Sequence, residues 1–183
     1  ADMLKTVDSM VMQFEIPIET VYYCVSFAKK NGIRCIVNPA PAGPVDMSAL
    51  AGLDYFVPNE SEAETITGMP VRTVEDAKQC AAKLLSGGVK RVILTLGANG
   101  SLLASREGME HIPAFSVKSI DSTGAGDAFI GSFAVFLGEG VPERDAVRRA
   151  NLYAGLSTTG VGTQKSFYDR KRYDAEWSAR KTS

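Results

Sequence analysis

Several residue types with familiar roles are scarce in this sequence of 183 residues. A single histidine, His111, excludes a metal site built from several histidines. No Cys-x-x-Cys pair occurs, so buried free thiols in a reducing compartment are expected at Cys24, Cys35 and Cys80. The formal net charge of −1 gives no attraction to nucleic acids or acidic membranes, and no apolar run is long enough to span a bilayer.

The sequence also lacks two common glycine-rich motifs. Neither Gly-x-x-x-x-Gly-Lys-Ser/Thr nor Gly-x-Gly-x-x-Gly occurs, which excludes a P-loop protein and argues against a dinucleotide-binding Rossmann domain. The start has no initiator methionine and nothing that resembles a signal peptide. We therefore expect a cytoplasmic protein whose true N-terminus was removed by processing or truncation.

What is present is an alternation of strand-like and helix-like segments. Hydrophobic residues make up 45% of the chain and charged residues 22%, which is typical of a globular domain. Strands are expected at 11–14, 34–37, 54–57 and 91–96, a hairpin over 101–113, and helices at 18–30, 60–67, 74–85, 126–138, 143–157 and 171–180. This order predicts an α/β fold with a mainly parallel sheet flanked by helices.

Polar residues follow the predicted strands. Glu15, Asn38, Asn59, Gly97 and Asp121 each stand just after a strand or at the next turn. Ligands of such sheets bind at the carboxyl ends of the strands, so these residues are expected to converge on one edge.

The stretch Asp121-Ser-Thr-Gly-Ala-Gly-Asp127 precedes a helix-length apolar run. Its glycines allow a tight turn, and the N–H groups and dipole at the helix start favour a bound anion such as phosphate. Asp127 would then lie beside that anion, where it could take a proton from an attacking hydroxyl. Alternatively, Asp127 only caps the helix or stabilises its first turn.

Asn59-Glu-Ser-Glu62 opens another predicted helix, and two interpretations are open. Asn59 and Glu62 have the spacing of a capping box. The same amide and carboxylate could instead help to hold a hydrated Mg²⁺, which prefers oxygen ligands. Both can be true, because a cap also fixes these side chains.

Two glycine-containing loops have weaker signals. Thr95-Leu-Gly-Ala-Asn-Gly100 could be a tight turn, or it could let the backbone approach a nucleotide. The segment 157–166 ends a helix, and with Asp121 and Thr123 its carbonyls could also enclose a monovalent cation.

The stretch Asp121-Ser-Thr-Gly-Ala-Gly-Asp-Ala-Phe129 resembles the second signature of the ribokinase-like (PfkB) carbohydrate kinases, which is long and specific. The segments 59–62, 95–100 and 157–166 occur in that family's order and spacing. Met12-Gln-Phe-Glu15 and Asn38-Pro-Ala-Pro-Ala42 are similar to its ribokinase branch. The resemblance covers essentially the whole chain and implies a ribokinase-like fold that uses ATP, Mg²⁺ and K⁺.

The resemblance also implies roles for the matching residues. Asp127 resembles the base that takes a proton from the sugar's 5-hydroxyl. Gly124, Ala125 and Gly126 resemble the anion hole for the γ-phosphate. The other matching positions are Asn59 and Glu62 for Mg²⁺ and phosphate; Thr95, Leu96, Gly97, Ala98, Asn99, Gly100 and Asn151 for the nucleotide; Asp121, Thr123, Ser157, Gly160, Gly162 and Ser166 for potassium; and Glu15 for the sugar.

Only the C-terminal three-fifths of the family's domain has a counterpart here, so residues 1–183 are expected to be part of a single kinase domain. The family's N-terminal glycine-rich signature, most sugar contacts and the β-sheet lid, through which homodimers pair, are missing. The implied reaction is the ATP-dependent phosphorylation of a sugar, foremost D-ribose to D-ribose 5-phosphate. We expect the chain alone to be nearly inactive and to expose strand edges and apolar surface. A fructokinase or nucleoside kinase, or a non-catalytic nucleotide-binding fragment, are the alternatives.

Overall fold

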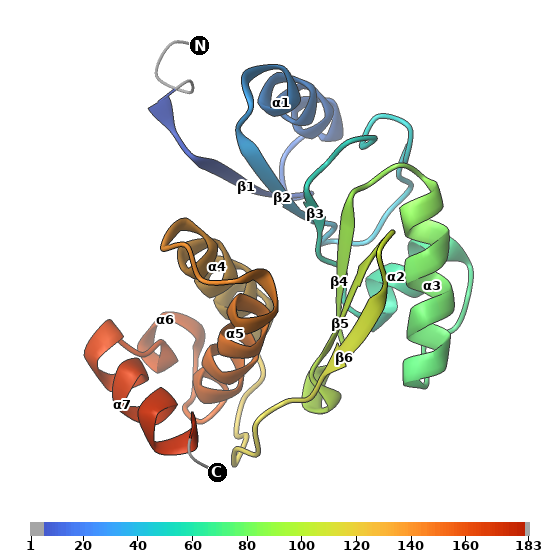
Figure 1. Cartoon of the computed structure of the whole chain (residues 1–183). Helices are drawn as coiled ribbons and strands as arrows, with labels where there is room; N and C mark the ends of the chain where they lie inside the picture. Colours follow the sequence, from blue (N-terminus) through green and yellow to red (C-terminus); the bar gives the residue numbers. More distant parts are fainter. Residues whose placement is uncertain (1–5, 182–183) are drawn as a thin grey trace. The chain divides into compact units, whose positions relative to one another are not determined.

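The computed structural model describes residues 6–181, which gather in two compact units (Figure 1). Unit 1 runs to Gly97 and includes Ser101–His111, and unit 2 comprises Ala98–Gly100 and the residues from Ile112 onward. The elements are β1 (Ser9–Gln13), α1 (Ile18–Asn31), β2 (Arg34–Asn38), β3 (Tyr55–Phe56), α2 (Glu60–Thr67), α3 (Val74–Ser86), β4 (Arg91–Thr95), a 3-10 helix (Gly97–Asn99), β5 (Ser101–Ser105), β6 (Met109–Ile112), α4 (Ala125–Gly138), α5 (Glu143–Ser157), α6 (Thr163–Ser166) and α7 (Arg170–Lys181).

Unit 1 is built on a six-stranded sheet whose strands lie in sequence order from β1 to β6. The pairs from β1 to β4 are parallel, and β5 runs antiparallel to β4. The predicted α/β fold with a mainly parallel sheet is therefore confirmed. β1 stands at an edge of the described sheet, and Val11 on it is 43% exposed.

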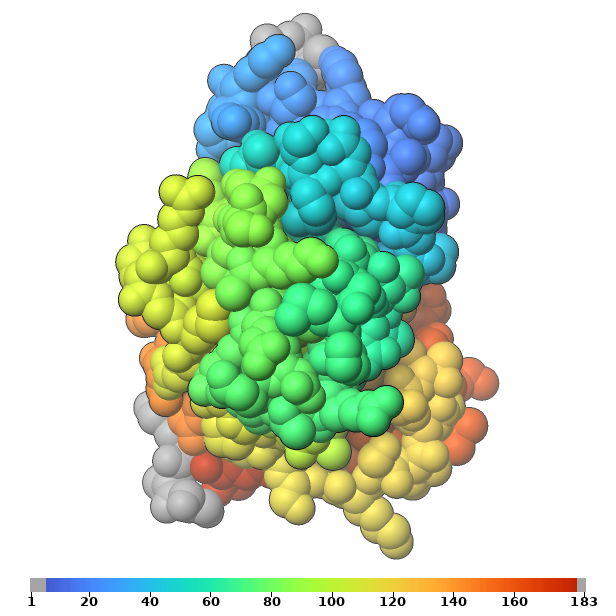
Figure 2. All heavy atoms as spheres, turned by 90° about the vertical axis from the view of Figure 1, so that its right-hand side faces the viewer, coloured from blue at the N-terminus to red at the C-terminus, as the bar shows by residue number. Residues whose placement is uncertain are grey.

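Helices α1, α2 and α3 supply the core that packs on the sheet of unit 1. Val25 from α1, Leu84 from α3 and Val92 from β4 belong to one buried cluster. The three central residues of β4 are fully buried, as predicted for a strand covered on both faces. Figure 2 shows the outer surfaces of α2 and α3, in green, side by side below the cyan loop after β2.

Unit 2 is helical, and α4 and α5 pack along each other within it. Helix α4 is so apolar because it buries Phe133 and five other side chains. Helix α7 joins them through aromatic side chains: the ring centroids of Tyr173 and Phe136 are 5.3 Å apart, and Trp177 lies against the guanidinium groups of Arg148 and Arg149 at 5.2 and 5.0 Å.

The predicted helices and strands are confirmed to within about two residues at their ends. Helix α6 and the 3-10 helix were not predicted, because a single turn shows no hydrophobic periodicity. Cys35 and Cys80 are buried free thiols as expected, but the expectation is wrong for Cys24, which is only half-buried since it lies beside the core-facing stripe of α1. Within residues 6–181, no helix is both long and apolar enough to cross a membrane.

Candidate active site

In unit 1, polar side chains gather at the carboxyl ends of the parallel strands. Gln13 and Asn38 are register partners at the ends of β1 and β2, and Gln13 Nε2 donates to Asn38 Oδ1 at 3.2 Å. Asn59 forms a parallel bridge with Thr95 at the end of β4. The predicted convergence is therefore confirmed for Asn38 and Asn59. Glu15 lies exposed in the turn after β1.

The prediction that Asp121 stands just after a strand or at the next turn is wrong. Strand β6 ends at Ile112, and residues 113–120 form a connection without regular structure before Asp121, which belongs to unit 2. The apolar and polar residues of this connection show no strand or helix periodicity, so its length could not be predicted from the sequence.

Asn59 and Glu62 form the capping box that starts α2. Asn59 Oδ1 accepts from the Glu62 N–H at 2.9 Å, and Glu62 Oε2 accepts from the Asn59 N–H at 2.8 Å. A third bond joins Asn59 Nδ2 to Glu62 Oε1 at 2.9 Å. The capping interpretation is confirmed, and the cap leaves both side chains in one orientation.

Glu62 is 6% exposed, and three N–H groups donate to its carboxylate. Besides the two from Asn59, Asn38 Nδ2 donates to Oε2 at 3.1 Å. Burial raises the pKa of Glu62, and the hydrogen bonds from the Asn59 backbone and the Asn38 side chain oppose that shift. A buried carboxylate of this kind favours any cation that comes near it.

The donor set of Asn59 and Glu62 fits a hydrated Mg²⁺ better than a bare one. A carboxylate has about four lone-pair positions, and three of those of Glu62 already accept N–H groups. Asn59 Oδ1 likewise accepts from Ser61 Oγ and the Glu62 N–H. Among residues 6–181 no group of three or more acidic, cysteine or histidine side chains could enclose a metal. These side chains can therefore reach a Mg²⁺ ion through its water molecules, which Mg²⁺ retains readily.

In unit 2, α4 begins at the predicted turn. Its N-cap, Gly124, has a φ of +79°, and a Cβ there would lie 2.8 Å from Thr163 Cγ2, so glycine is required. Asp127 lies in the first turn, as predicted, and it is exposed; the N-cap is Gly124, and no side chain caps this helix. The N–H of Ala125 donates to the Ser122 carbonyl at 3.1 Å, so the N–H of Gly126 and the helix dipole are what this turn can offer to an anion.

Asp121 ties together the two segments that were predicted to enclose a monovalent cation. Its Oδ1 accepts from the Thr123 N–H and its Oδ2 from the Gly162 N–H, both at 3.0 Å. Hydrogen bonds from the Thr123 side chain, and then from the N–H groups of Gly162 and Thr123, hold the pKa of Asp121 at about 2. Asp121 therefore keeps its negative charge at neutral pH.

The remaining residues of that predicted site fall into two groups. Ser166 Oγ donates to the Gly162 carbonyl, and a Cβ on Gly160 would lie 2.8 Å from Ser166 Oγ, so these three are close together. Ser157 Oγ instead donates to the Ala154 carbonyl of its own helix. The donor set of a carboxylate, hydroxyls and a glycine loop fits a monovalent cation that takes oxygen ligands.

Two parts of the predicted nucleotide site meet in unit 2. A Cβ on Gly100 would lie 2.2 Å from the Ile112 carbonyl oxygen, so the backbones touch there and only glycine fits. Asn151, which is 7% exposed, donates from Nδ2 to the same oxygen at 3.1 Å. Asn151 therefore fixes the segment after β6 against the end of the 95–100 loop.

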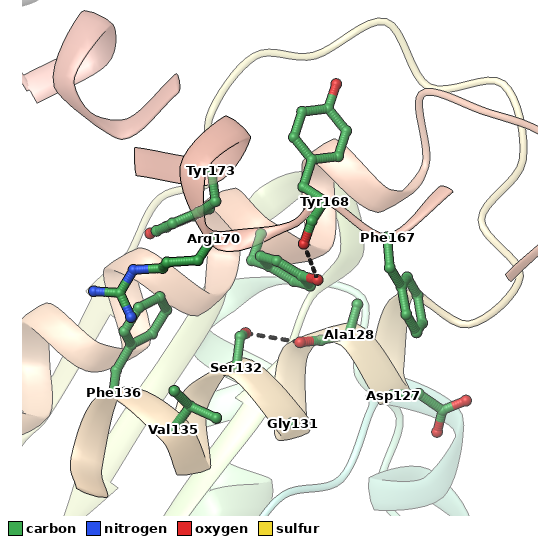
Figure 3. A pocket seen from close by; sticks show the side chains of 11 residues that line it. Asp127, Ala128, Gly131, Ser132, Val135, Phe136, Phe167, Tyr168, Arg170 and Tyr173 are labelled. Atoms are coloured by element: carbon green, nitrogen blue, oxygen red, sulfur yellow. Dashed lines mark hydrogen bonds between the residues drawn. The ribbon is translucent and has the colours of Figure 1, made fainter. Parts of the chain in front are cut away.

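Sequence reasoning missed one pocket of about 320 Å³ in unit 2 (Figure 3). It lies beside α4, and its lining residues include Ser132, Val135, Tyr153 and Phe167. Two of its polar groups bond within the chain: Tyr153 OH donates to the Tyr168 carbonyl, and Ser132 Oγ donates to the Ala128 carbonyl. Aromatic residues in the C-terminal segment were the only sequence signal for it.

Comparisons with known proteins point to one family. Residues 5–170 match the pfkB family carbohydrate kinases. The chain is 44% identical over 168 residues to deoxyribokinase of Salmonella typhimurium, covering 91% of this chain and 55% of that protein. It is 36% identical over 166 residues to ribokinase of Staphylococcus aureus, covering 90% and 55%.

A solved structure of Arabidopsis thaliana ribokinase, complexed with ribose and ATP, superposes with a TM-score of 0.90. It is 30% identical and is matched over 95% of this chain and 57% of its own. The chain thus spans a little more than half the length of these relatives. Together with the predicted signature at 121–129, these matches show that the chain belongs to the pfkB family of carbohydrate kinases.

Proposed function

We propose that this chain carries the nucleotide site and the general base of an ATP-dependent kinase that phosphorylates a pentose. The observation that carries the proposal is the start of α4, where the exposed carboxylate of Asp127 stands in the first turn of a helix capped by Gly124. Unpaired N–H groups and the helix dipole favour a phosphate at such a helix start.

In the proposed reaction, a hydroxyl oxygen of the sugar bonds to the γ-phosphorus of ATP while the bond to the β–γ bridging oxygen breaks. Asp127 accepts the hydroxyl proton, and ADP leaves. Within the proposed anion hole of Gly124 to Gly126, the Gly126 N–H and the helix dipole balance negative charge on the phosphoryl oxygens. Most of the rate enhancement in such reactions comes from placement and charge neutralisation, and a general base contributes roughly 10²- to 10⁴-fold.

Two cations belong to the proposal. Asn59 and Glu62 would hold Mg²⁺ through its waters, and that ion supplies positive charge to the phosphates. K⁺ would be held by Asp121, Thr123, Ser157, Gly160, Gly162 and Ser166. The hydrogen bonds that join Asp121 to Thr123 and Gly162 support this part of the proposal.

The acceptor is proposed as a pentose, with Glu15 as one contact. The sequence alone favoured D-ribose, but the relatives named above include a deoxyribokinase as well as ribokinases. These sugars differ by one hydroxyl, and a site that hydrogen-bonds a hydroxyl rejects the analogue that lacks it. Phosphorylation assays of the intact protein with ribose, deoxyribose, fructose and adenosine separate these possibilities. Fructose or adenosine as the preferred acceptor would favour the fructokinase or nucleoside kinase alternative.

Replacing Asp127 by asparagine in the intact protein tests the base. Turnover should fall by at least roughly 10²-fold while ATP affinity, measured by calorimetry, stays unchanged, because the amide keeps the shape but cannot take a proton. Asp145→Asn, a half-buried aspartate in the first turn of α5, is the control and should keep full turnover. Near-normal turnover in Asp127→Asn would overturn the proposal.

A second candidate is nucleotide binding without catalysis by residues 1–183, which span 55% of each of these relatives. ATP calorimetry and a phosphoryl-transfer assay on residues 1–183 decide between the two. Binding without transfer would favour the fragment.

A further inference from the structure

Asn38 joins the sheet of unit 1 to the carboxylate of Glu62. Its side-chain N–H₂ group makes two hydrogen bonds, one to the Val57 carbonyl at 2.9 Å and one to Glu62 Oε2 at 3.1 Å. Its Oδ1 accepts from Gln13 Nε2 at 3.2 Å. Both donor hydrogens and the acceptor of this amide are therefore committed to partners on three different segments.

The other hydrogen bonds of Glu62 are local to the start of α2. They come from the backbone and side chain of Asn59, three residues earlier, and they would persist wherever α2 moved. The bond from Asn38 spans 24 residues and comes from β2. It is therefore the contact that sets the Glu62 carboxylate against the edge of the sheet.

The amide of Asn38 can serve only in one orientation. Its two acceptors, Val57 O and Glu62 Oε2, require the nitrogen on their side, and the donor from Gln13 requires the oxygen on the other. A carboxylate of the same shape would set oxygen against oxygen at both acceptors. The site therefore requires an amide and not merely a side chain of this size.

We propose that Asn38 is a positioning residue that fixes the Glu62 carboxylate at the carboxyl edge of the sheet, and that Gln13 sets the orientation of the Asn38 amide. The inference rests on the proposed function, in which Glu62 helps to hold hydrated Mg²⁺. Glu62 acts on the ion through water, so a small tilt of its carboxylate moves the water that it binds. Partners that orient metal-site groups in this way typically change metal affinity by about 10- to 100-fold when they are replaced.

The test measures ATP binding to this chain by calorimetry, with Mg²⁺ and with EDTA. Asn38→Asp keeps the size of the side chain but replaces its donor. It should weaken binding of Mg²⁺-ATP by about 10- to 100-fold and leave metal-free ATP binding nearly unchanged. Asn38→Ala removes the donor without adding a charge, so it should lose less affinity for Mg²⁺-ATP than Asn38→Asp. A role in packing alone would give the opposite order, because aspartate fills the space of asparagine and alanine does not.

Asn31→Asp is the matched control. Asn31 also donates from Nδ2 to a backbone carbonyl, that of Phe27 at 2.8 Å, but it lies exposed at the end of α1. It should keep the full effect of Mg²⁺ on ATP binding. If Asn38→Asp fails to fold, as judged by circular dichroism, Gln13→Glu provides the same test one step away, since it places an acceptor against Asn38 Oδ1.

The possible results separate the two proposals. If the unmodified chain binds ATP no better with Mg²⁺ than with EDTA, the proposed Mg²⁺ site fails and the inference falls with it. If Mg²⁺ strengthens binding equally in the unmodified chain and in Asn38→Asp, or in Gln13→Glu where the first variant does not fold, only the role of Asn38 is overturned. A selective loss of the Mg²⁺ effect supports both.

Discussion

Replacing Gly100 by alanine should destabilise unit 2, because the added methyl group meets backbone. The φ of Gly100 is +91°, and its Cβ would lie 2.2 Å from the Ile112 oxygen and 2.5 Å from the Ala114 nitrogen. No side-chain rotation can relieve contacts with main-chain atoms. A left-handed conformation costs a non-glycine residue about 1–2 kcal/mol, and overpacking adds roughly 1–3 kcal/mol. The free energy of unfolding should therefore fall by about 2–5 kcal/mol.

Gly140→Ala is the matched control for this prediction. Gly140 also belongs to unit 2 and has a φ of +78°, but no atom lies within 4 Å of its Cβ position. Its free energy of unfolding should fall only by the cost of the left-handed backbone conformation, about 1–2 kcal/mol. Urea unfolding is followed by the fluorescence of Trp177, the one tryptophan of the chain, and by circular dichroism, since two units need not unfold together. Equal losses in the two variants would refute the close approach of the backbones at Gly100.

Two further predictions concern packing and pH. Trp177→Ala should lower the free energy of unfolding of unit 2 by roughly 3–5 kcal/mol, measured by thermal unfolding followed by circular dichroism. The reason is that Trp177 is 9% exposed and packs against Phe115, Arg148 and Arg149. A change below about 0.5 kcal/mol would contradict this prediction. Burial, with a smaller effect of Asp54, raises the pKa of Cys35 from 9.0 to about 12. The neutral thiol therefore stabilises the fold fully below pH 9.0, and that stability is lost as the pH rises towards 12. Urea unfolding at several pH values between 9.0 and about 12 measures this loss. The free energy of unfolding should fall less steeply with pH in Cys35→Ala than in the unmodified chain, by up to about 1.4 kcal/mol per pH unit. Equal slopes in the two proteins would contradict the prediction.

The pocket beside α4 illustrates a limit of sequence reasoning. Tyr153, Phe167 and Tyr173 come from α5, from the segment before α7 and from α7, and they meet only once these elements pack. In the sequence, each aromatic residue is equally compatible with an ordinary core position. The pocket could therefore not be predicted from their spacing.

The sequence by itself determined the features that depend on neighbours within a turn or two. Strand-helix alternation predicted the α/β fold, and the three-residue spacing of Asn59 and Glu62 predicted the capping box. The glycines before Asp127 likewise predicted where α4 begins. These features follow from backbone hydrogen bonding and side-chain period, which are local and so can be read along the chain.

Only the tertiary structure decided which distant residues touch. The contact of Asn38 with Glu62 spans 24 residues and depends on the order of the strands. The bond between Asp121 and Gly162 spans 41 residues, and the touching backbones at Gly100 and Ile112 depend on the path of a connection without periodic pattern. Such contacts are set by the packing of whole elements, because a side chain's partners across the fold depend on register and direction that no short stretch of sequence contains.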